Sequence, residues 1–377
     1  MSIIETHSLS ADYRGWPKAS SPPPFCPAAA QRLLEIFVQK HPSAGPAPMV
    51  AERWLNSPGA SLEGRAKIDR IQMILEPYSQ GAQSQTFLCL KTSRKAPEGY
   101  KLYLLKTPIQ DYPNPLIRSD IEKTCSDHLI SLKTKELERG QIFQKFANKS
   151  DLEDLVLSSI RKNARLIPEQ ILSISKQLLL KVEMLHNLRI AHLDLKPMNI
   201  LVHENTLRDL SVELEVFITD FGLSQRFASS KTRVGMKPTG TYCFFPPEFV
   251  SKTEEEKKKD RWVNPFQADL FSLGLSLFFL TSGTYLPYCL EPHLPRRNRQ
   301  DFRALVSIYH QKLHAAFLSM DSTKLLECEK LHKELITAYV PPIPGVRTVI
   351  FELLRILPFN RPSAGACLKQ LMEAKTP

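Results

Sequence analysis

The stretch that decides the fold lies between residues 192 and 222. It reads His192-Leu-Asp194-Leu-Lys196-Pro-Met-Asn199-Ile-Leu-Val202 and, after an interval, Ile218-Thr-Asp220-Phe221-Gly222. Apolar residues follow Asn199 and precede Asp220, so the stretch is predicted to form one strand-loop-strand span. This span carries two carboxylates, a lysine and an asparagine, the set of groups that phosphoryl transfer from a metal-bound nucleotide requires.

The residues before this stretch predict a buried helix that leads directly into it. Within residues 168–185 apolar side chains recur every three or four positions, which is the spacing of one helix face. The members of this face are Ile171, Ile174, Leu178, Val182 and Leu185. Further helices are predicted at residues 266–282 and 349–357.

The earlier part of the chain shows the pattern of strands. Strands are predicted at residues 69–76, 86–91, 100–106 and 140–146, with a helix at 117–132 before the last of them. Strands in succession imply a small antiparallel sheet. A strand-rich first part and a mainly helical second part, with the chemistry after the junction, predict an α+β fold of two lobes around a cleft.

The length and overall composition are those of an ordinary folded protein. Of its 377 residues 42% are hydrophobic and 24% are charged, which argues against wholesale disorder and against a membrane protein. Fifty basic and 39 acidic residues give a formal charge of +11, which favours polyanions such as a nucleotide. Because the charge is widely spread, we expect no specific nucleic-acid partner. The longest apolar run, residues 270–280, is too short to span a membrane.

The cysteines and the first residues indicate the compartment. Seven cysteines lie far apart without a Cys-x-x-Cys pair, which favours reduced thiols in the cytoplasm over a zinc site or disulfides. The chain begins without an apolar core typical of a signal peptide. Residues 1–63 are rich in Pro, Ser and Ala and predict an N-terminal extension with one helix at residues 27–40. The apolar stripe of this helix either binds a partner or rests on the following domain.

Further segments follow the opening stretch in a fixed order. They are Gly240-Thr241-Tyr-Cys-Phe-Phe-Pro246-Pro247-Glu248, Asp269-Leu-Phe-Ser-Leu-Gly274 and Leu357-Pro-Phe-Asn-Arg361-Pro-Ser-Ala. With the opening stretch they resemble the catalytic loop, metal-binding triplet, activation-segment end, central helix and late Arg-Pro segment of the eukaryotic-type serine/threonine protein kinases. The resemblance covers about residues 68–372 and implies a bilobal fold in which Arg361 pairs with Glu248. Pro246 departs from it, because alanine is usual there.

The resemblance implies roles for the residues of the catalytic loop and its surroundings. Asp194 would accept the proton of the substrate hydroxyl, and Lys196 would neutralise charge on the transferring group. Asn199 and Asp220 would hold Mg²⁺, since hard oxygen ligands suit this ion. Lys196 and Thr241 resemble the serine/threonine branch of the family, and the hydroxyl of Thr241 is expected near Asp194. A packed structural histidine is expected at position 192, next to the phenylalanine of the triplet.

In the first lobe the resemblance is looser. The candidate ATP-binding residues are Lys106, Gly81, Ser84, Glu122 and Phe146. Lys106 ends a predicted strand and would reach the α- and β-phosphates, with Glu122 as its helix partner, although the same helix also offers Asp127. The loop at residues 79–84 keeps one glycine where the family has three, so its backbone approaches the phosphates less freely.

Two other departures bear on regulation. Leu193 stands where an arginine often separates the histidine and the aspartate, so no cation is present there to bind an activation-loop phosphate. We therefore predict activity without phosphorylation of that loop. The interval 201–219 is longer than a hairpin needs, and residues 287–344 separate the central helix from the last helices. Both are candidate insertions that bind partners.

The sequence thus predicts an N-terminal extension over residues 1–63 and a kinase domain over 64–377, divided into lobes at 64–147 and 148–377. The leading hypothesis is a Mg²⁺- and ATP-dependent serine/threonine protein kinase acting on a protein substrate. The alternative is a pseudokinase scaffold, in which the altered glycine loop fails to hold ATP productively. A small-molecule kinase of related fold is a third hypothesis. A Ser/Pro-rich leader is also compatible with delivery by a bacterium into a host cell.

Overall fold

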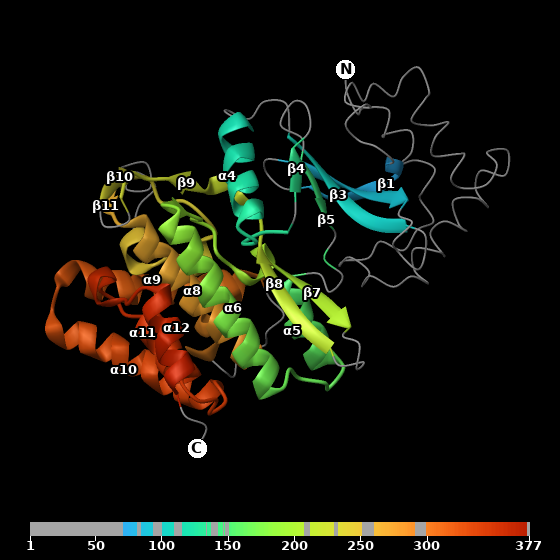
Figure 1. The fold of residues 1–377 in the computed structure, drawn as a ribbon. Coiled ribbons are helices and arrows are strands. Elements are labelled where there is room, and N and C mark those ends of the chain that lie inside the picture. Colours follow the sequence, from blue (N-terminus) through green and yellow to red (C-terminus); the bar gives the residue numbers. More distant parts are fainter. Residues whose placement is uncertain are drawn as a thin grey trace. The chain divides into compact units, whose positions relative to one another are not determined.

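The computed structural model describes residues 71–80, 84–92, 100–108, 115–132, 134–136, 142–145, 147, 151–206, 212–229, 233–250, 260–290 and 299–374 (Figure 1). The chain divides into two compact units, residues 1–150 and 151–377. The helix predicted at residues 27–40 and the candidate site residues Gly81 and Phe146 lie outside the described residues.

The described part of the first unit contains a small antiparallel sheet. Its strands are β1 (Ile71–Gln80), β2 (Ser84–Thr92), β3 (Tyr100–Pro108), β4 (Thr134–Glu136) and β5 (Ile142–Lys145), in the spatial order β1-β2-β3-β5-β4. All neighbouring strands pair antiparallel. The first three predicted strands are confirmed, and β5 lies within the fourth. Strand β4 was not predicted, because three residues are too few to show an alternating pattern.

Helix α4 (Pro115–Asp127) ends before the predicted limit at residue 132. Leu129 adopts a left-handed conformation with a φ of 57°. The N–H of Leu129 donates to the carbonyl of Ser126 (3.1 Å), and that of Ile130 donates to the carbonyl of Cys125 (2.9 Å). These bonds form a Schellman-type helix end. The apolar residues after Asp127 therefore belong to a turn.

The described part of the second unit is mainly helical. Its α-helices are α5 (Leu152–Arg161), α6 (Pro168–Asn187), α8 (Pro265–Ser282), α9 (Arg299–Ser319), α10 (Ser322–Tyr339), α11 (Val346–Leu353) and α12 (Ala364–Glu373). Its strands pair as β6 (Ile190–Ala191) with β9 (Gln225–Arg226), β7 (Ile200–Thr206) with β8 (Val212–Ile218), and β10 (Val234–Met236) with β11 (Arg261–Val263). The helices predicted at 168–185 and 266–282 are confirmed, whereas the one predicted at 349–357 begins and ends earlier.

Helices α6 and α8 form the core of this unit. All members of the predicted α6 face are 0–5% exposed, which confirms that face. Helix α8 begins where the side chain of Asn264 accepts the N–H of Phe266 (3.0 Å), and it ends at Gly283, whose φ of 73° suits glycine. Nearly all of α8 is buried. Among the described helices, none combines the length and apolarity needed to cross a membrane.

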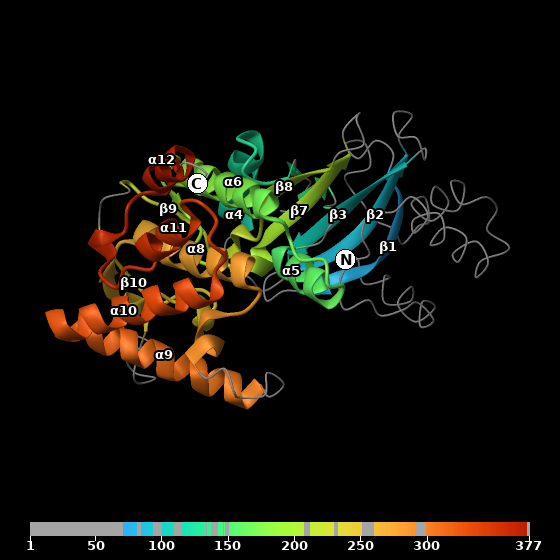
Figure 2. The ribbon, with the colours of Figure 1, turned by 90° about the horizontal axis from the view of Figure 1, so that it is seen from below.

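Helices α9 and α10 occupy much of the predicted insertion at residues 287–344 and lie side by side (Figure 2). A chain of buried polar contacts joins them to α11. The hydroxyl of Tyr309 lies 3.0 Å from Nε2 of His332, and Nδ1 of His332 lies 3.0 Å from the carbonyl oxygen of Leu354. Because that carbonyl only accepts, Nδ1 carries the proton and Nε2 accepts from the tyrosine.

Two buried histidines are expected to make the folded protein sensitive to acid. Burial lowers the pKa of both His310 and His332 to about 4, from an ordinary value of 6.5. Between these values the unfolded chain binds protons that the folded chain does not, so the free energy of unfolding decreases as the pH falls from 6.5 towards 4. Denaturant unfolding should show a decrease of roughly 2 kcal/mol per pH unit between about pH 6 and pH 5. Equal stability at pH 7 and pH 5 would contradict this expectation.

Candidate functional site

The buried carboxylate of Asp269 binds the backbone of the catalytic loop. Asp269 of α8 is 1% exposed, and it accepts the backbone N–H of His192 (2.7 Å) and of Leu193 (2.8 Å). It also lies 3.2 Å from Nε2 of His186 on α6. Leu193 has a φ of 65°, a left-handed conformation that is costly for leucine. The two bonds to Asp269 hold the loop in this conformation.

His192 connects the catalytic loop to the Asp-Phe-Gly triplet. Its Nε2 lies 2.9 Å from the carbonyl oxygen of Thr219, so Nε2 carries the proton and donates. Its Nδ1 accepts the backbone N–H of Asp194 (3.3 Å), and its ring packs edge-on against Phe221, with centroids 5.1 Å apart. His192 is fully buried. The prediction of a packed structural histidine is confirmed.

The side chains of Lys196 and Thr241 meet at the carboxylate of Asp194. Lys196 Nζ donates to Asp194 Oδ2 and to Thr241 Oγ1, both at 2.7 Å. The hydroxyl of Thr241 donates to Asp194 Oδ1, also at 2.7 Å. The side chains of Asp194 and Lys196 are 8% and 17% exposed. The structure thus brings together Asp194, Lys196 and Thr241, three of the four residues that the sequence analysis assigned to catalysis, and both carboxylate oxygens of Asp194 are engaged.

Asn199 and Asp220 were predicted to hold a metal, and their chemistry fits Mg²⁺. The amide nitrogen of Asn199 donates to the backbone carbonyl of Asp194 (2.8 Å) and to its Oδ2 (3.2 Å), which leaves the amide oxygen for a cation. Asp220 is exposed and left-handed (φ 61°), between β8 and the short helix η5 (Phe221–Leu223). Among the described residues, no cluster of three or more His, Cys, Asp or Glu side chains could hold a metal. Mg²⁺ needs only one or two ligands from the protein, because waters and substrate phosphates supply the others.

The activation segment approaches the catalytic loop closely at Gly240. This residue has a φ of 112°, and a Cβ added to it would collide with the carbonyl oxygen of Leu193. Only glycine combines this conformation with this contact. The glycine therefore lets the next residue, Thr241, reach Asp194.

The thiol of Cys243 lies close enough to Lys196 and Asp194 for their charges to affect its pKa. Burial raises the pKa of Cys243 to about 12, although the charge of Lys196 acts in the opposite direction. At neutral pH Cys243 is therefore an uncharged thiol, which is a poor nucleophile. The geometry assigns no covalent role to it.

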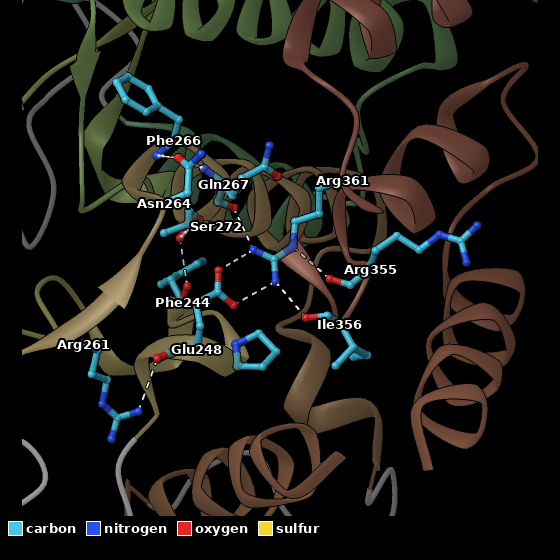
Figure 3. A network of polar contacts seen from close by, with 12 residues as sticks. Phe244, Glu248, Arg261, Asn264, Phe266, Gln267, Ser272, Arg355, Ile356 and Arg361 are labelled. Carbon is cyan, nitrogen blue, oxygen red and sulfur yellow. Dashed lines mark hydrogen bonds and ion pairs between the residues drawn. The ribbon is translucent and has the colours of Figure 1, made fainter. Parts of the chain in front are cut away.

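The end of the activation segment is fixed by a buried ion pair (Figure 3). Arg361 donates to both carboxylate oxygens of Glu248, at 2.7 and 2.9 Å, and the two side chains are 0% and 3% exposed. The same guanidinium donates to backbone carbonyls. These belong to Gln267 (2.8 Å), Arg355 (2.8 Å) and Ile356 (3.1 Å). The predicted pairing of Glu248 with Arg361 is confirmed, and it joins the 3₁₀ helix η7 (Pro247–Phe249) to α8 and to the segment that follows α11.

Leu193 lies in an apolar cluster and is 4% exposed. Its buried neighbours in this cluster are Ala191, Met236, Phe249, Val263, Phe266 and Ala268. Met236 and Val263 come from β10 and β11, so the cluster joins the catalytic loop to the activation segment through apolar contacts. The position where the family often has an arginine is thus occupied by a side chain of the core.

Asp269 was the member of the site that sequence reasoning missed. The segment containing it was recognised as the start of a helix, but no role was given to its carboxylate. A signal was present, because Asp269 is the one charged residue in the apolar helix 266–282. A carboxylate in a buried helix requires hydrogen-bond donors.

The candidate ATP-binding residues belong to the first unit. Lys106 lies on β3, paired with Thr86 of β2 and with Ile142 of β5, and Ser84 begins β2. Glu122 lies on α4 and is 9% exposed. Their predicted contacts with a nucleotide remain proposals.

Similarity to known proteins identifies the family of this chain. A model of the protein kinase domain matches residues 127–372, so it includes nearly all of the second unit and only the end of the first. The mouse (Mus musculus) dual specificity protein kinase TTK is 24% identical over 270 residues, which are 69% of this chain and 30% of the relative. The probable serine/threonine-protein kinase fhkB of Dictyostelium discoideum is 33% identical over 198 residues, 52% of this chain and 15% of the relative.

The ER sensor for unfolded proteins ire1 of Schizosaccharomyces pombe is 28% identical over 153 residues, 37% of this chain and 14% of the relative. In each case the chain spans less than a third of the relative's length. The family model nevertheless covers well over half of this chain and includes every residue of the Asp194 site. The chain therefore belongs to the eukaryotic-type protein kinase family.

Proposed function

We propose that this protein is a Mg²⁺- and ATP-dependent serine/threonine protein kinase in which Asp194 is the catalytic base. The observation that carries the proposal is the contact of Asp194 with Lys196 and Thr241, beside Asn199. A degenerate family member has no need to keep these groups in mutual hydrogen-bonding distance. Their common geometry supports an intact phosphotransfer site.

The arrangement assigns a task to each side chain. Lys196, Thr241 and Asn199 hold the Asp194 carboxylate in one orientation, and a remaining lone pair of that carboxylate accepts the proton of the acceptor hydroxyl. Lys196 also supplies positive charge next to the group being transferred. Mg²⁺, when bound by Asn199 and Asp220, neutralises phosphate charge. Most of the rate enhancement then comes from positioning and from charge stabilisation.

The proposal extends to ATP and to the type of acceptor. Lys106 would bind the α- and β-phosphates with Glu122 as its partner, and Gly81, Ser84 and Phe146 would line the nucleotide site. Serine/threonine specificity is supported by Lys196 with Thr241 and by the name of the Dictyostelium relative, a probable serine/threonine-protein kinase. The mouse relative is named as a dual specificity kinase, so acceptor type must be measured.

Labelled ATP tests the proposal directly. The full chain is incubated with γ-labelled ATP, Mg²⁺ and generic serine/threonine and tyrosine acceptor proteins, and the labelled amino acids are identified. We expect phosphoserine and phosphothreonine, and no transfer by Asp194→Ala, by Asp220→Ala or in the presence of a chelator. Transfer that persists in both variants would overturn the assignment of the site.

A pseudokinase scaffold is the second candidate, favoured by the single glycine in the loop at residues 79–84. The same preparation distinguishes the two functions when ATP binding is measured alongside transfer. Absence of transfer to every acceptor class, with or without nucleotide binding, supports the scaffold and contradicts the kinase.

Loss of the Thr241 hydroxyl is expected to lower activity. Thr241→Val removes the donor to Asp194 Oδ1 and the acceptor of Lys196 at nearly constant volume, so both side chains lose an orienting contact. We expect kcat to decrease about ten-fold. Thr241→Ser keeps the hydroxyl and serves as the matched control, with activity close to that of the unchanged protein. Equal activities of the two variants would show that the hydroxyl has no such role.

Activity is expected to be independent of activation-loop phosphorylation. Leu193 is packed among apolar residues and offers no charge to a phosphate. Phosphatase treatment should leave the rate of transfer unchanged, as measured with labelled ATP after the phosphatase is removed. The candidate acceptors in the loop are Ser229, Ser230, Thr232 and Thr239. An inert dephosphorylated protein whose activity returned on phosphorylation of these residues would contradict the expectation.

A further inference from the structure

Helix α9 contacts the segment after Thr241 through two buried histidines one turn apart. His310 and His314 are 0% and 2% exposed. Nδ1 of His314 lies 2.9 Å from the carbonyl oxygen of Pro247, so it carries the proton and donates. The ring of His310 lies against the ring of Tyr242, with centroids 4.8 Å apart and planes at 55°. Each histidine therefore contacts one end of residues 242–247.

The two contacted ends begin two short helices. Tyr242 begins the 3₁₀ helix η6 (Tyr242–Phe244), in which Phe244 N–H donates to the carbonyl of Thr241 (2.9 Å). Pro247 begins η7, the helix that carries Glu248 and its ion pair with Arg361. Segment 242–247 is thus contacted at both ends by α9, and the ion pair of Glu248 fixes the residue that follows it.

Tyr242 combines a supported ring with an open surface. It is 38% exposed although His310 lies against its ring, and it also contacts Phe245 edge-on, with centroids 5.7 Å apart. The residue before it, Thr241, donates to Asp194. Because consecutive Cα atoms are only about 3.8 Å apart, the backbone of Tyr242 lies directly beside that of the residue that contacts Asp194.

Helix α9 is itself anchored to α10 and, through α10, to the end of α11. Tyr309, the neighbour of His310, contacts His332 of α10, which contacts the Leu354 carbonyl at the end of α11. Burial lowers the pKa of His310, so its ring is uncharged at neutral pH and packs against Tyr242 as a neutral ring. Helix α9, which contacts Tyr242 through His310, is therefore itself fixed by contacts within the second unit.

We propose that His310 and His314 are positioning residues for acceptor-protein binding, which hold segment 242–247 so that Tyr242 contacts the acceptor beside Asp194. The proposal rests on the proposed function, because it concerns the acceptor of the same site. Neither histidine touches the reacting groups. Their loss therefore affects recognition of the acceptor protein more than the chemical step or the binding of ATP.

Steady-state kinetics with dephosphorylated casein as the acceptor protein test this role. For His310→Ala and His314→Leu we expect the KM for casein to increase about five-fold, with kcat and the KM for ATP within about two-fold of the unchanged protein. His310→Phe keeps a ring against Tyr242, and His314→Asn keeps an N–H donor close to the position of Nδ1. Both should restore the KM for casein. Gln311→Ala, on the exposed side of α9, is the matched control and should change nothing.

Hydrogen exchange provides a readout that needs no activity. Exchange of the amides in residues 242–250 should be faster in His310→Ala and His314→Leu, with exchange in α6 unchanged. Equal changes in both regions indicate global destabilisation and contradict a positioning role. An unchanged KM for casein in these variants, with an active wild-type protein, overturns this proposal alone. A wild-type protein that transfers no phosphate overturns the proposed function, and with it the role of α9 in acceptor binding.

Discussion

Asp194→Asn is expected to reduce kcat for phosphate transfer to a protein about a thousand-fold. The asparagine is nearly the same size, but its amide does not accept the proton of the acceptor hydroxyl, and general-base catalysis contributes roughly 10²–10⁴ to a rate. The substitution also removes the negative charge that Lys196 contacts at 2.7 Å. The rate is measured with labelled ATP at saturating acceptor and nucleotide.

The fold should survive this substitution. The backbone carbonyl of residue 194 still accepts from Asn199, and the bonds from the loop to Asp269 are unaffected. Circular dichroism and thermal unfolding should therefore match those of the unchanged protein. Asp260→Asn makes the same chemical change at an exposed position and serves as the control. Asp194→Asn protein with more than a tenth of the wild-type kcat would rule out Asp194 as the base.

Breaking the Glu248–Arg361 pair is expected to have the largest effect on stability. Both side chains are almost fully buried, so removal of one leaves an uncompensated charge in the core. Such single removals cost about 3–5 kcal/mol. Arg361→Met should cost more than Glu248→Gln, because the guanidinium also donates to three backbone carbonyls that the methionine leaves without their donor. Denaturant unfolding monitored by circular dichroism gives both values.

The double variant Glu248→Gln with Arg361→Met measures how much of the stability comes from the direct interaction between the two charges. We expect its loss of stability to be smaller than the sum of the two single losses, because neither charge is left alone. The exposed pair Lys369–Glu373, with both side chains more than 60% exposed, offers a matched control. Removing it should leave stability nearly unchanged. Additive losses in the buried pair would contradict a direct coupling of the two residues.

Much of the site was predictable because its residues are close together in sequence. His192 to Asn199 lie within one loop, and Asp220 follows two residues after the end of β8. The α6 face is visible as a period of three to four residues, and α8 as an apolar segment of helical length. The Glu248–Arg361 pair spans 113 positions. It was predicted from the resemblance to known kinases, since no local pattern contains it.

Other features have no local signal. The contact between Tyr242 and His310 joins residues far apart in the chain, and each looks ordinary in its own segment. Asp269 does stand out as the one charged residue of an apolar helix. Its partners do not, because its two bonds to backbone N–H groups cross 76 and 77 positions. The end of α4 was placed too late because the residues after Asp127 are as apolar as a helix requires, and only the left-handed Leu129 stops it.

The amino-acid sequence by itself determined the kinds of groups available for catalysis and the periods that make α6 and α8 buried helices, because both depend on side-chain types at short spacing. The tertiary structure alone decided that Asp269 holds the catalytic loop, that Leu193 fills an apolar cluster and that α9 supports Tyr242. These contacts form when segments distant in sequence pack together, and hydrogen bonds and ring contacts depend on distances that a one-dimensional pattern does not contain.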